Sequence, residues 1–366
     1  MTRLFRFASA NEVDTTLVHG VQGHPFVPEF GSQARCGSVS FGASLRSRLL
    51  FLSSGKRWMR RNAPAFDVAF AISSMYSTLA LADAARRAST PSVSRIENST
   101  KGLPARGWYS RIRDIDAARY AFLRRSNAVI AMSSQVEDEL LEAGIEQPRV
   151  VRIPQHCDTR LFVPRTAHER SEWRRHLGWP DRFTFVCVGE VVPRKRQLML
   201  VEAVARLARE GYDVQLALVG PIHDVAYGRE IRDAGDALGI RDRLILSGFN
   251  RQVQFFYFAS DAFLLPSVNE NMPNSLVESL SCGLPVVVSD FAGAADCVDS
   301  GSSGWVVPLG GDERLEWEQR MKSIIAGGCS AFGPRARAFA ESQLDSRIIW
   351  PRYLAVLRSA AEEGAR

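Results

Sequence analysis

From Phe66 onward, short apolar runs alternate with longer stretches in which apolar residues recur at helical spacing. The short runs are typical of strands buried in a sheet, and the longer stretches are typical of amphipathic helices. The first half predicts strands at 66–74, 91–96, 127–134 and 150–154. It predicts helices at 78–89 and 134–144, with a long helical stretch that ends near residue 126. Such alternation indicates a parallel sheet.

The same alternation returns after a polar turn with two prolines, PQHCDTRLFVP, which we interpret as the link between two domains. The second half predicts strands at 184–190, 214–220, 244–248, 263–265 and 286–288, and helices at 197–210, 227–238, 251–259 and 274–282. Tail helices are predicted at 334–343 and 346–362. The fold class is therefore α/β, with two Rossmann-like doubly wound domains that face a cleft.

We assign residues 1–160 to the first domain and residues 161–345 to the second. The last residues, 346–366, are expected to cross back and join the first domain. Residues 1–45 show no clear period, and we expect short strands and loops there. Residues 46–61 interleave large apolar side chains with Lys and Arg, as in segments that lie on an anionic bilayer. A core-facing helix with a solvated basic face is the alternative, which we favour.

The composition, with 46% hydrophobic and 23% charged residues among 366, is that of an ordinary globular protein of two domains. No run of about 18 apolar residues predicts a transmembrane helix, and the first residues are too polar for a signal peptide. We therefore expect a cytoplasmic protein. The six cysteines form no CxxC pair, which predicts buried thiols rather than a disulfide framework or a zinc site.

The net charge of +6 is unevenly distributed along the chain. Residues 1–165 hold 23 Lys and Arg against 14 Asp and Glu, whereas the rest holds 23 against 26. A basic first half favours an anionic partner, either a membrane surface, a nucleic acid or a phosphorylated acceptor, although a GC-rich genome also enriches Arg. No nucleic-acid recognition motif is present, so we expect no nucleic acid. We expect weak peripheral contact with the anionic inner face of a membrane.

Candidate chemistry concentrates in FLLPSVNENMPNSLVESLSCGLP at 263–285, which predicts a strand, an acidic turn and a helix. Asn274 and Ser275 lie at the helix start, where free N–H groups and the helix dipole favour an anion. Glu270 and Glu278 bracket this start. N–H donors between two carboxylates suit a sugar attached to a diphosphate. The alternative is an ordinary strand–helix unit with both carboxylates solvated.

A second candidate for phosphate binding is GEVVPRKRQ at 189–197, which leaves a predicted strand and enters a helix. Arg194 and Lys195 would lie at the carboxyl edge of the second sheet, where they can neutralise a diphosphate leaving group. In the first domain, Glu97 and Asn98 follow a predicted strand, and ligands of open α/β sheets bind at such ends.

With these motifs in place, the second half resembles the retaining family-4 glycosyltransferases of the GT-B fold, also described as glycosyl transferases group 1. The resemblance covers roughly residues 125–310 and rests on the linker, VGEVVPRK, LALVG, LSGF, PSVNENMPNSLVESLSCGLPVVVSDFAGAADCV and GSSGWVVP. It implies an enzyme that moves a hexose from a nucleoside diphosphate sugar to a glycan, lipid or other hydroxyl acceptor.

The resemblance implies that Lys195 and Glu270 are the catalytic residues, with Lys195 on the donor diphosphate and Glu270 on the transferred sugar. Glu278 would bind the ribose of the nucleotide. The remaining donor-binding residues would be Gly189 and Arg194, the amides of Asn274, Ser275 and Leu276, and Phe249 and Asn250 near the base. Glu97 and Asn98 would lie on the acceptor side.

The implied reaction proceeds with retention, without a protein nucleophile, a metal or another cofactor. The DxD sequence at 114–116 lies in a predicted Arg-rich helix, so we expect no metal there. Glu190 stands where relatives often carry Arg, and either Arg194 or Arg196 would replace that cation. The first domain has an abbreviated or diverged start. The alternative function is a catalytically impaired partner protein that binds a nucleotide sugar; an epimerase or a phosphorylase is less consistent with the motifs.

Overall fold

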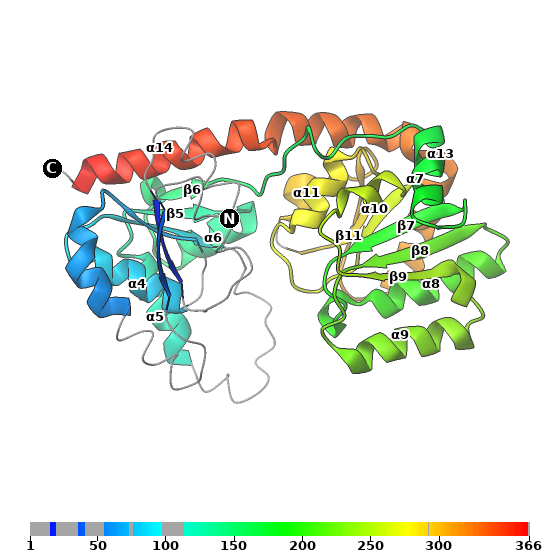
Figure 1. The fold of residues 1–366 in the computed structure, drawn as a ribbon, viewed down its shortest axis with the longest axis horizontal. Coiled ribbons are helices and arrows are strands. Elements are labelled where there is room, and N and C mark those ends of the chain that lie inside the picture. The colour runs from blue at the N-terminus through cyan, green and yellow to red at the C-terminus, as the bar shows by residue number, and fades with distance from the viewer. Residues whose placement is uncertain are drawn as a thin grey trace.

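The computed structural model describes residues 15–19, 36–40, 55–72, 76–96, 113–291 and 293–364. Two lobes of sheet and helix lie side by side, with the N-terminal half on the left and the green to yellow half on the right of Figure 1. A long C-terminal helix runs along the top from the second lobe to the first (Figure 1).

The first domain is built on a parallel sheet with the strand order β3-β4-β5-β6. These strands are β3 (Ala69–Ala71), β4 (Ser92–Ile96), β5 (Ala128–Ala131) and β6 (Val150–Arg152). The helices are α4 (Tyr76–Arg86), α5 (Arg113–Leu123) and α6 (Ser134–Glu142), and residues 55–62 are also helical. β1 (Thr15–His19) and β2 (Cys36–Ser40) pair in parallel with each other.

The second domain holds a parallel sheet with the strand order β12-β11-β10-β7-β8-β9. Its strands are β7 (Phe183–Val188), β8 (Val214–Val219), β9 (Leu244–Gly248), β10 (Ala262–Leu265), β11 (Val286–Ser289) and β12 (Gly304–Val307). Its helices are α7 (Ala167–His176), α8 (Gln197–Arg209), α9 (Val225–Ala237), α10 (Gln254–Phe258), α11 (Asn274–Ser281), α12 (Ala294–Cys297) and α13 (Glu313–Gln343).

The point where this strand order reverses lies between β7 and β10. The chain leaves β7 towards β8 on one side and leaves β10 towards β11 on the other. Connections that diverge in this way open a crevice at the carboxyl ends of the two strands, where open α/β sheets bind ligands. The turn after β7 and the acidic turn after β10 therefore meet. Two facing Rossmann-like domains were predicted, and the prediction is confirmed.

The C-terminal helix α14 (Ser346–Gly364) crosses back and becomes part of the first domain, as predicted (Figure 1). Its buried residues Ile349, Trp350 and Tyr353 pack in one core with Val93 of β4 and Ile130 of β5. These large side chains remove apolar surface from water, which is the dominant favourable term in folding. The crossing thereby anchors the end of the chain to the domain in which it began.

Besides the four-residue helix α12, two helical segments of the second domain are missing from the sequence prediction. One is α7, which begins with a capping box in which Thr166 and Glu169 each bond the other's backbone N–H. The sequence TAHE carries this signal, because Ser or Thr followed three residues later by Glu is typical of a helix start. The other is the first part of α13, since the predicted helix begins only at residue 334. A kink at Gly328, whose backbone is non-helical with φ 62°, separates the two parts of α13.

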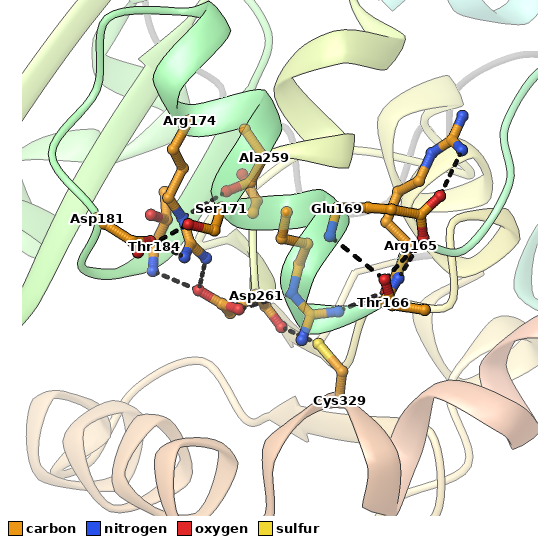
Figure 2. A network of polar contacts seen from close by, with 12 residues as sticks. Arg165, Thr166, Glu169, Ser171, Arg174, Asp181, Thr184, Ala259, Asp261 and Cys329 are labelled. Atoms are coloured by element: carbon orange, nitrogen blue, oxygen red, sulfur yellow. Dashed lines mark hydrogen bonds and ion pairs between the residues drawn. The ribbon is translucent and has the colours of Figure 1, made fainter.

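A network of polar contacts fixes α7 to the second sheet (Figure 2). The carboxylate of Asp261, just before β10, accepts hydrogen bonds from Arg174, from Nε of Arg170 at 2.9 Å and from the N–H of Thr184 at 2.8 Å. Asp181 binds the same Arg174 at 2.8 Å from a far more exposed position. The two arginines are mostly buried, and the carboxylate of Asp261 is the buried acceptor that they share.

Asp345 connects the interdomain linker to the start of α14. Its buried carboxylate accepts hydrogen bonds from Thr159 of the linker and from Nε of Arg347 at 2.9 Å. Burial alone would raise its pKa, but the hydrogen bonds from Arg347 and Thr159 outweigh burial and lower the pKa from 3.8 to about 2. The negative charge therefore stabilises the folded state.

Acid is expected to weaken this connection. Since the folded pKa lies below the unfolded one, the contribution of Asp345 is fully present above pH 4 and is lost as the pH falls towards 2. The shift corresponds to about 2 kcal/mol. The measurement is the free energy of unfolding in urea between pH 5 and pH 2. Wild-type protein should lose about 2 kcal/mol more than Asp345→Asn over this range. Equal losses would contradict the assignment.

Candidate active site

A cavity of about 470 Å³ opens between the domains at the carboxyl ends of β7 and β10. Arg95 of β4 lines it from the first domain, and Gln155 of the linker lines it from the side. From the second domain, the turn after β7 contributes Gly189, Glu190, Arg194 and Lys195, and the segment after β10 contributes residues 270–275 and Glu278. The two motifs singled out in the sequence thus share one cavity.

Two direct contacts join the domains beside this cavity. The N–H and the hydroxyl of Ser134, at the start of α6, both donate to the carboxylate of Asp296 in α12 at 2.6 Å. A carboxylate at a helix N-terminus satisfies an orphan N–H group and complements the helix dipole. On the other side, the N–H of Gln155 lies 3.1 Å from Sδ of Met272. The second domain therefore caps a helix of the first.

Lys195 lies at the centre of the second-domain wall. It ends a single 3₁₀ turn, Pro193–Lys195, and its side chain is only 7% exposed. Its Nζ lies 2.6 Å from Oε1 of Glu270, and Nη1 of Arg194 lies 2.7 Å from the same oxygen. Two cations therefore converge on one carboxylate oxygen. The sequence motifs point to all three residues, but their mutual ion pairs come only from the structure.

The backbone around Lys195 is shaped by two unusual conformations. Arg196 has a left-handed backbone with φ 54°, which is uncommon for a residue other than glycine. Its guanidinium is held in a bidentate ion pair by Glu313 of α13. Gly189 has φ 148°, and a Cβ added there would lie 3.4 Å from Cε and Nζ of Lys195. Glycine thus leaves room for the ammonium group.

The structure decides which arginine lies in the cavity beside Glu190. Oε2 of Glu190 lies 3.6 Å from Nη2 of Arg194, and both side chains are about half exposed. Arg194 lines the cavity, whereas Arg196 points to Glu313. Arg194 is therefore the arginine that lies in the cavity beside Glu190 and offsets its carboxylate.

The start of α11 faces the cavity with fewer free amides than the sequence suggested. Pro273 is the N-cap residue, and the N–H of Leu276 already donates to the carbonyl of Pro273 at 3.1 Å. A first-turn bond therefore occupies the N–H of Leu276, and its role as a phosphate-binding amide stays a prediction. The N–H groups of Asn274 and Ser275 find no acceptor among the described residues. These two remain for an anion.

Glu278 is oriented by a tyrosine that the sequence patterns do not single out. The hydroxyl of Tyr257, in α10, donates to Oε2 of Glu278 at 3.1 Å and lies 3.3 Å from the carbonyl oxygen of Ser275. Tyr257 is 1% exposed, and burial followed by the nearby charge of Glu278 raises its pKa well above 10. It thus stays protonated and remains a donor. An aromatic residue in a predicted short helix gives no sign of this role.

The side-chain amide of Asn271 is a second feature of the cavity that the sequence did not predict. It lines the cavity and is 2% exposed, yet neither Nδ2 nor Oδ1 has a hydrogen-bond partner in the described part of the chain. A buried amide without partners costs free energy, so such a group in a native protein calls for an explanation. A polar ligand that enters the cavity is one source of the missing hydrogen bonds.

Two protein-family models match the chain. The model described as Glycosyl transferase 4-like domain matches residues 5–156, and the model described as Glycosyl transferases group 1 matches residues 169–330. Each half of the chain therefore matches a glycosyl transferase model, and the two matches together span most of the chain. The first match also covers most of residues 1–45, where the motifs alone gave no resemblance.

Among curated proteins, the chain is similar to the alpha-D-kanosaminyltransferase of Streptomyces kanamyceticus, with 27% identity over 195 residues, 52% of this chain and 50% of the relative. It is also similar to the GDP-mannose-dependent alpha-(1-6)-phosphatidylinositol monomannoside mannosyltransferase of Mycolicibacterium smegmatis, with 28% identity over 228 residues, 58% of this chain and 56% of the relative. The chain spans about half the length of these curated relatives.

Two solved structures extend the likeness over nearly the whole chain. HepE of Anabaena in complex with UDP and glucose has a TM-score of 0.75 and 19% identity, covering 93% of this chain and 91% of that one. Sucrose-phosphate synthase of Thermosynechococcus elongatus has a TM-score of 0.79 and 17% identity, covering 98% and 91%. At such identities the likeness shows the fold, which is GT-B.

The structure does not bring every predicted site residue to the cavity. Phe249, directly after β9, is 70% exposed, and the side chain of Asn250 accepts a hydrogen bond from the N–H of Gln252 at 2.7 Å. Neither lines the cavity, although Val253 of the same loop does. Glu97 and Asn98 lie outside the described residues. Their predicted roles stay predictions.

Three further expectations concern metal, thiols and membrane. Within the described ranges, no three His, Cys, Asp or Glu side chains gather as a metal site, and the reaction's need for metal stays untested. The five cysteines whose side chains are described are free thiols, and four of them are buried. Among the described residues, no helix is both long and apolar enough to cross a bilayer.

Proposed function

We propose that this protein transfers a hexose from a nucleoside diphosphate sugar to a hydroxyl of a glycan, a lipid or another acceptor, with retention and without a metal or other cofactor. The observation that carries the proposal is the pairing of Lys195 and Arg194 with Glu270 beside the free amides of α11. This arrangement offers cations and N–H donors to a diphosphate, and carboxylates to sugar hydroxyls. The relatives named above are transferases of kanosamine and mannose by their names.

The cleaved bond joins the anomeric carbon of the sugar to an oxygen of the diphosphate. As this bond breaks, its electron pair passes to the diphosphate, where the ammonium of Lys195 and the amides of Asn274 and Ser275 stabilise the growing charge. Preorganised donors of this kind act where charge develops in the transition state. The acceptor oxygen bonds to the anomeric carbon on the same face, and its proton passes to the departing phosphate oxygen.

Three further residues contact other parts of the donor in this scheme. Glu270 contacts hydroxyls of the transferred sugar near the anomeric carbon. Glu278, oriented by Tyr257, receives the ribose hydroxyls. Asn271 gains partners from the polar ligand, which relieves the cost of its buried amide. The retaining course needs no protein nucleophile, unlike most retaining glycosidases, which use a pair of carboxyl groups.

A thermal-shift panel of UDP-, GDP- and ADP-sugars tests the donor half of the proposal. A ligand that binds only the folded state raises the midpoint of unfolding, so one base should raise it by several degrees at about a hundred times its Kd. The shift should disappear in Lys195→Ala and persist in Lys322→Ala, since Lys322 pairs with Glu210 on the surface of the second domain. A panel without any shift would exclude the donor assignment.

Donor turnover separates the enzyme from the impaired partner protein. With the donor chosen by the panel, we expect transfer to added glycan or lipid acceptors, or slow hydrolysis of the donor to free sugar. Tight donor binding by calorimetry with neither reaction would instead support the partner protein. The two outcomes differ in a product that chromatography detects directly.

We also propose weak peripheral contact of the first domain with the anionic inner face of a membrane, in a cytoplasmic protein. The helical residues 55–62 carry Arg57, Arg60 and Arg61 on exposed positions, whereas Trp58 is half-buried against Phe66, with ring centroids 6.2 Å apart. Basic side chains near an anionic leaflet each contribute about 1 kcal/mol. Flotation with vesicles rich in phosphatidylserine at low salt should recover the protein, and no recovery would exclude the contact.

A further inference from the structure

The anion position in front of Lys195 is already occupied by a group of the protein itself. Oε1 of Glu270 lies 2.6 Å from Nζ of Lys195 and 2.7 Å from Nη1 of Arg194. The side chains of Lys195 and Glu270 are only 7% and 13% exposed. Charge-assisted hydrogen bonds of this length are among the stronger ones in proteins, and the one from Lys195 is largely shielded from water, whereas Arg194 is about half exposed. A carboxylate therefore fills the position that the proposed function gives to a phosphate.

A diphosphate needs the same two cations. Among the described residues of the second-domain wall, Arg194 and Lys195 are the basic residues that line the cavity, and Arg95 lies on the opposite wall. If Glu270 kept both ion pairs, an incoming diphosphate would meet a like charge and find its cations taken. Like charges in close contact destabilise a bound state strongly when water is excluded. Binding of the donor therefore requires that the ion pairs of Glu270 with Lys195 and Arg194 break.

We propose that the carboxylate of Glu270 takes the place of the donor diphosphate until the donor binds. The carboxylate pairs with Lys195 and Arg194 before binding, and the diphosphate displaces it. The displaced carboxylate then contacts the hydroxyls of the sugar. The inference rests on the proposed function and adds a second task to Glu270. A donor that carries a sugar returns hydrogen bonds to the released carboxylate, whereas a nucleoside diphosphate without sugar leaves it without a partner.

This displacement of Glu270 gives the site a preference for one form of the nucleotide over another, which no single contact provides. The protein binds the intact donor better than the nucleoside diphosphate product, because only the donor compensates Glu270. After transfer, the carboxylate can return to Lys195 and Arg194 and compete with the product for them. Glu270 thereby favours release of the product, in addition to its contact with the sugar.

Calorimetry with inorganic pyrophosphate, UDP and GDP tests the exchange on the full chain. Pyrophosphate carries the charge without a sugar or a base, so it reports on the cations alone. If the cations are available about a tenth of the time in the wild type, freeing them should tighten binding about tenfold. We therefore expect Glu270→Gln to bind pyrophosphate about tenfold more tightly, and Glu270→Ala to behave in the same way.

The matched control is Glu278→Gln, which removes the same single charge from the same cavity. Glu278 accepts a hydrogen bond from Tyr257, whereas Lys195 and Arg194 pair with Glu270. Its removal should change pyrophosphate affinity less than about twofold, because the cations stay paired with Glu270. Thermal unfolding midpoints verify that each variant is folded.

The outcomes separate this inference from the proposed function. A wild-type protein that binds neither UDP nor GDP nor their sugars overturns the proposed function and the inference with it. If the wild type binds one of them, the inference alone fails when Glu270→Gln binds pyrophosphate no more tightly than the wild type. It also fails when Glu278→Gln tightens binding as much, since the effect would then be one of general charge.

Discussion

Replacement of Lys195 by alanine is expected to lower the rate of sugar transfer by about a hundredfold to a thousandfold, the range for losing one preorganised donor at a developing charge. The ammonium is nearly buried at the centre of the cavity, where its electrostatic effect on a leaving diphosphate is large. Arg194 still pairs with Glu270 in this variant, so the fold should persist. The measurement is steady-state turnover with the donor that the thermal-shift panel selects.

Glu270→Gln is the companion variant, and transfer should fall to a comparable degree because the contact with the sugar is lost. Lys322→Ala provides the matched control, since it removes a lysine of α13 that pairs with Glu210, away from the cavity. It should keep wild-type turnover. Normal turnover in both Lys195→Ala and Glu270→Gln would remove the catalytic assignment of the cavity.

The largest expected effect on stability belongs to Asp261→Ala. This change removes the acceptor shared by Arg170, Arg174 and the N–H of Thr184, and it deprives two mostly buried guanidinium groups of their one buried carboxylate among the described residues (Figure 2). Breaking a buried pair from one side costs about 3–5 kcal/mol, because the remaining charge is buried and uncompensated. Denaturation in urea, followed by circular dichroism, measures the loss.

Asp181→Ala is the control for this experiment, because Asp181 binds the same Arg174 from a position that is 63% exposed. Exposed ion pairs contribute about 0–1 kcal/mol, so little stability should be lost. A similar loss in the two variants would mean that α7 is not held through the carboxylate of Asp261. Comparing the two variants therefore tests whether the burial of the carboxylate, and not its charge alone, determines how much free energy of unfolding is lost.

The strands and helices around the cavity could be predicted because their signals are local. The apolar run before Glu270 and the glycine after α11 mark the bounds of a strand and a helix, and the structure has both where they were expected. The capping box at Thr166 is an equally local signal for the start of α7. The spacing of the motifs along the chain also predicts that Lys195 and Glu270 share one site.

The ion-pair and hydrogen-bond partners of these residues could not be predicted from the sequence. Nothing local states that Glu270 pairs with Lys195, since 75 residues separate them and only the reversal of strand order between β7 and β10 brings their turns together. Tyr257 was not singled out by the sequence, yet its hydroxyl orients Glu278. The amide of Leu276 was expected to be free, and a first-turn hydrogen bond occupies it.

Short stretches of sequence suffice to specify the alternation of strand and helix, the two parallel sheets and the residues that carry the chemistry, because backbone preferences and hydrophobic burial act locally. The folded arrangement was needed to establish which charges neutralise one another, that Arg194 rather than Arg196 enters the cavity, and that Asp296 of one domain caps a helix of the other. These outcomes depend on Coulomb interactions and burial between residues far apart along the chain, and such distances exist only after the chain has folded.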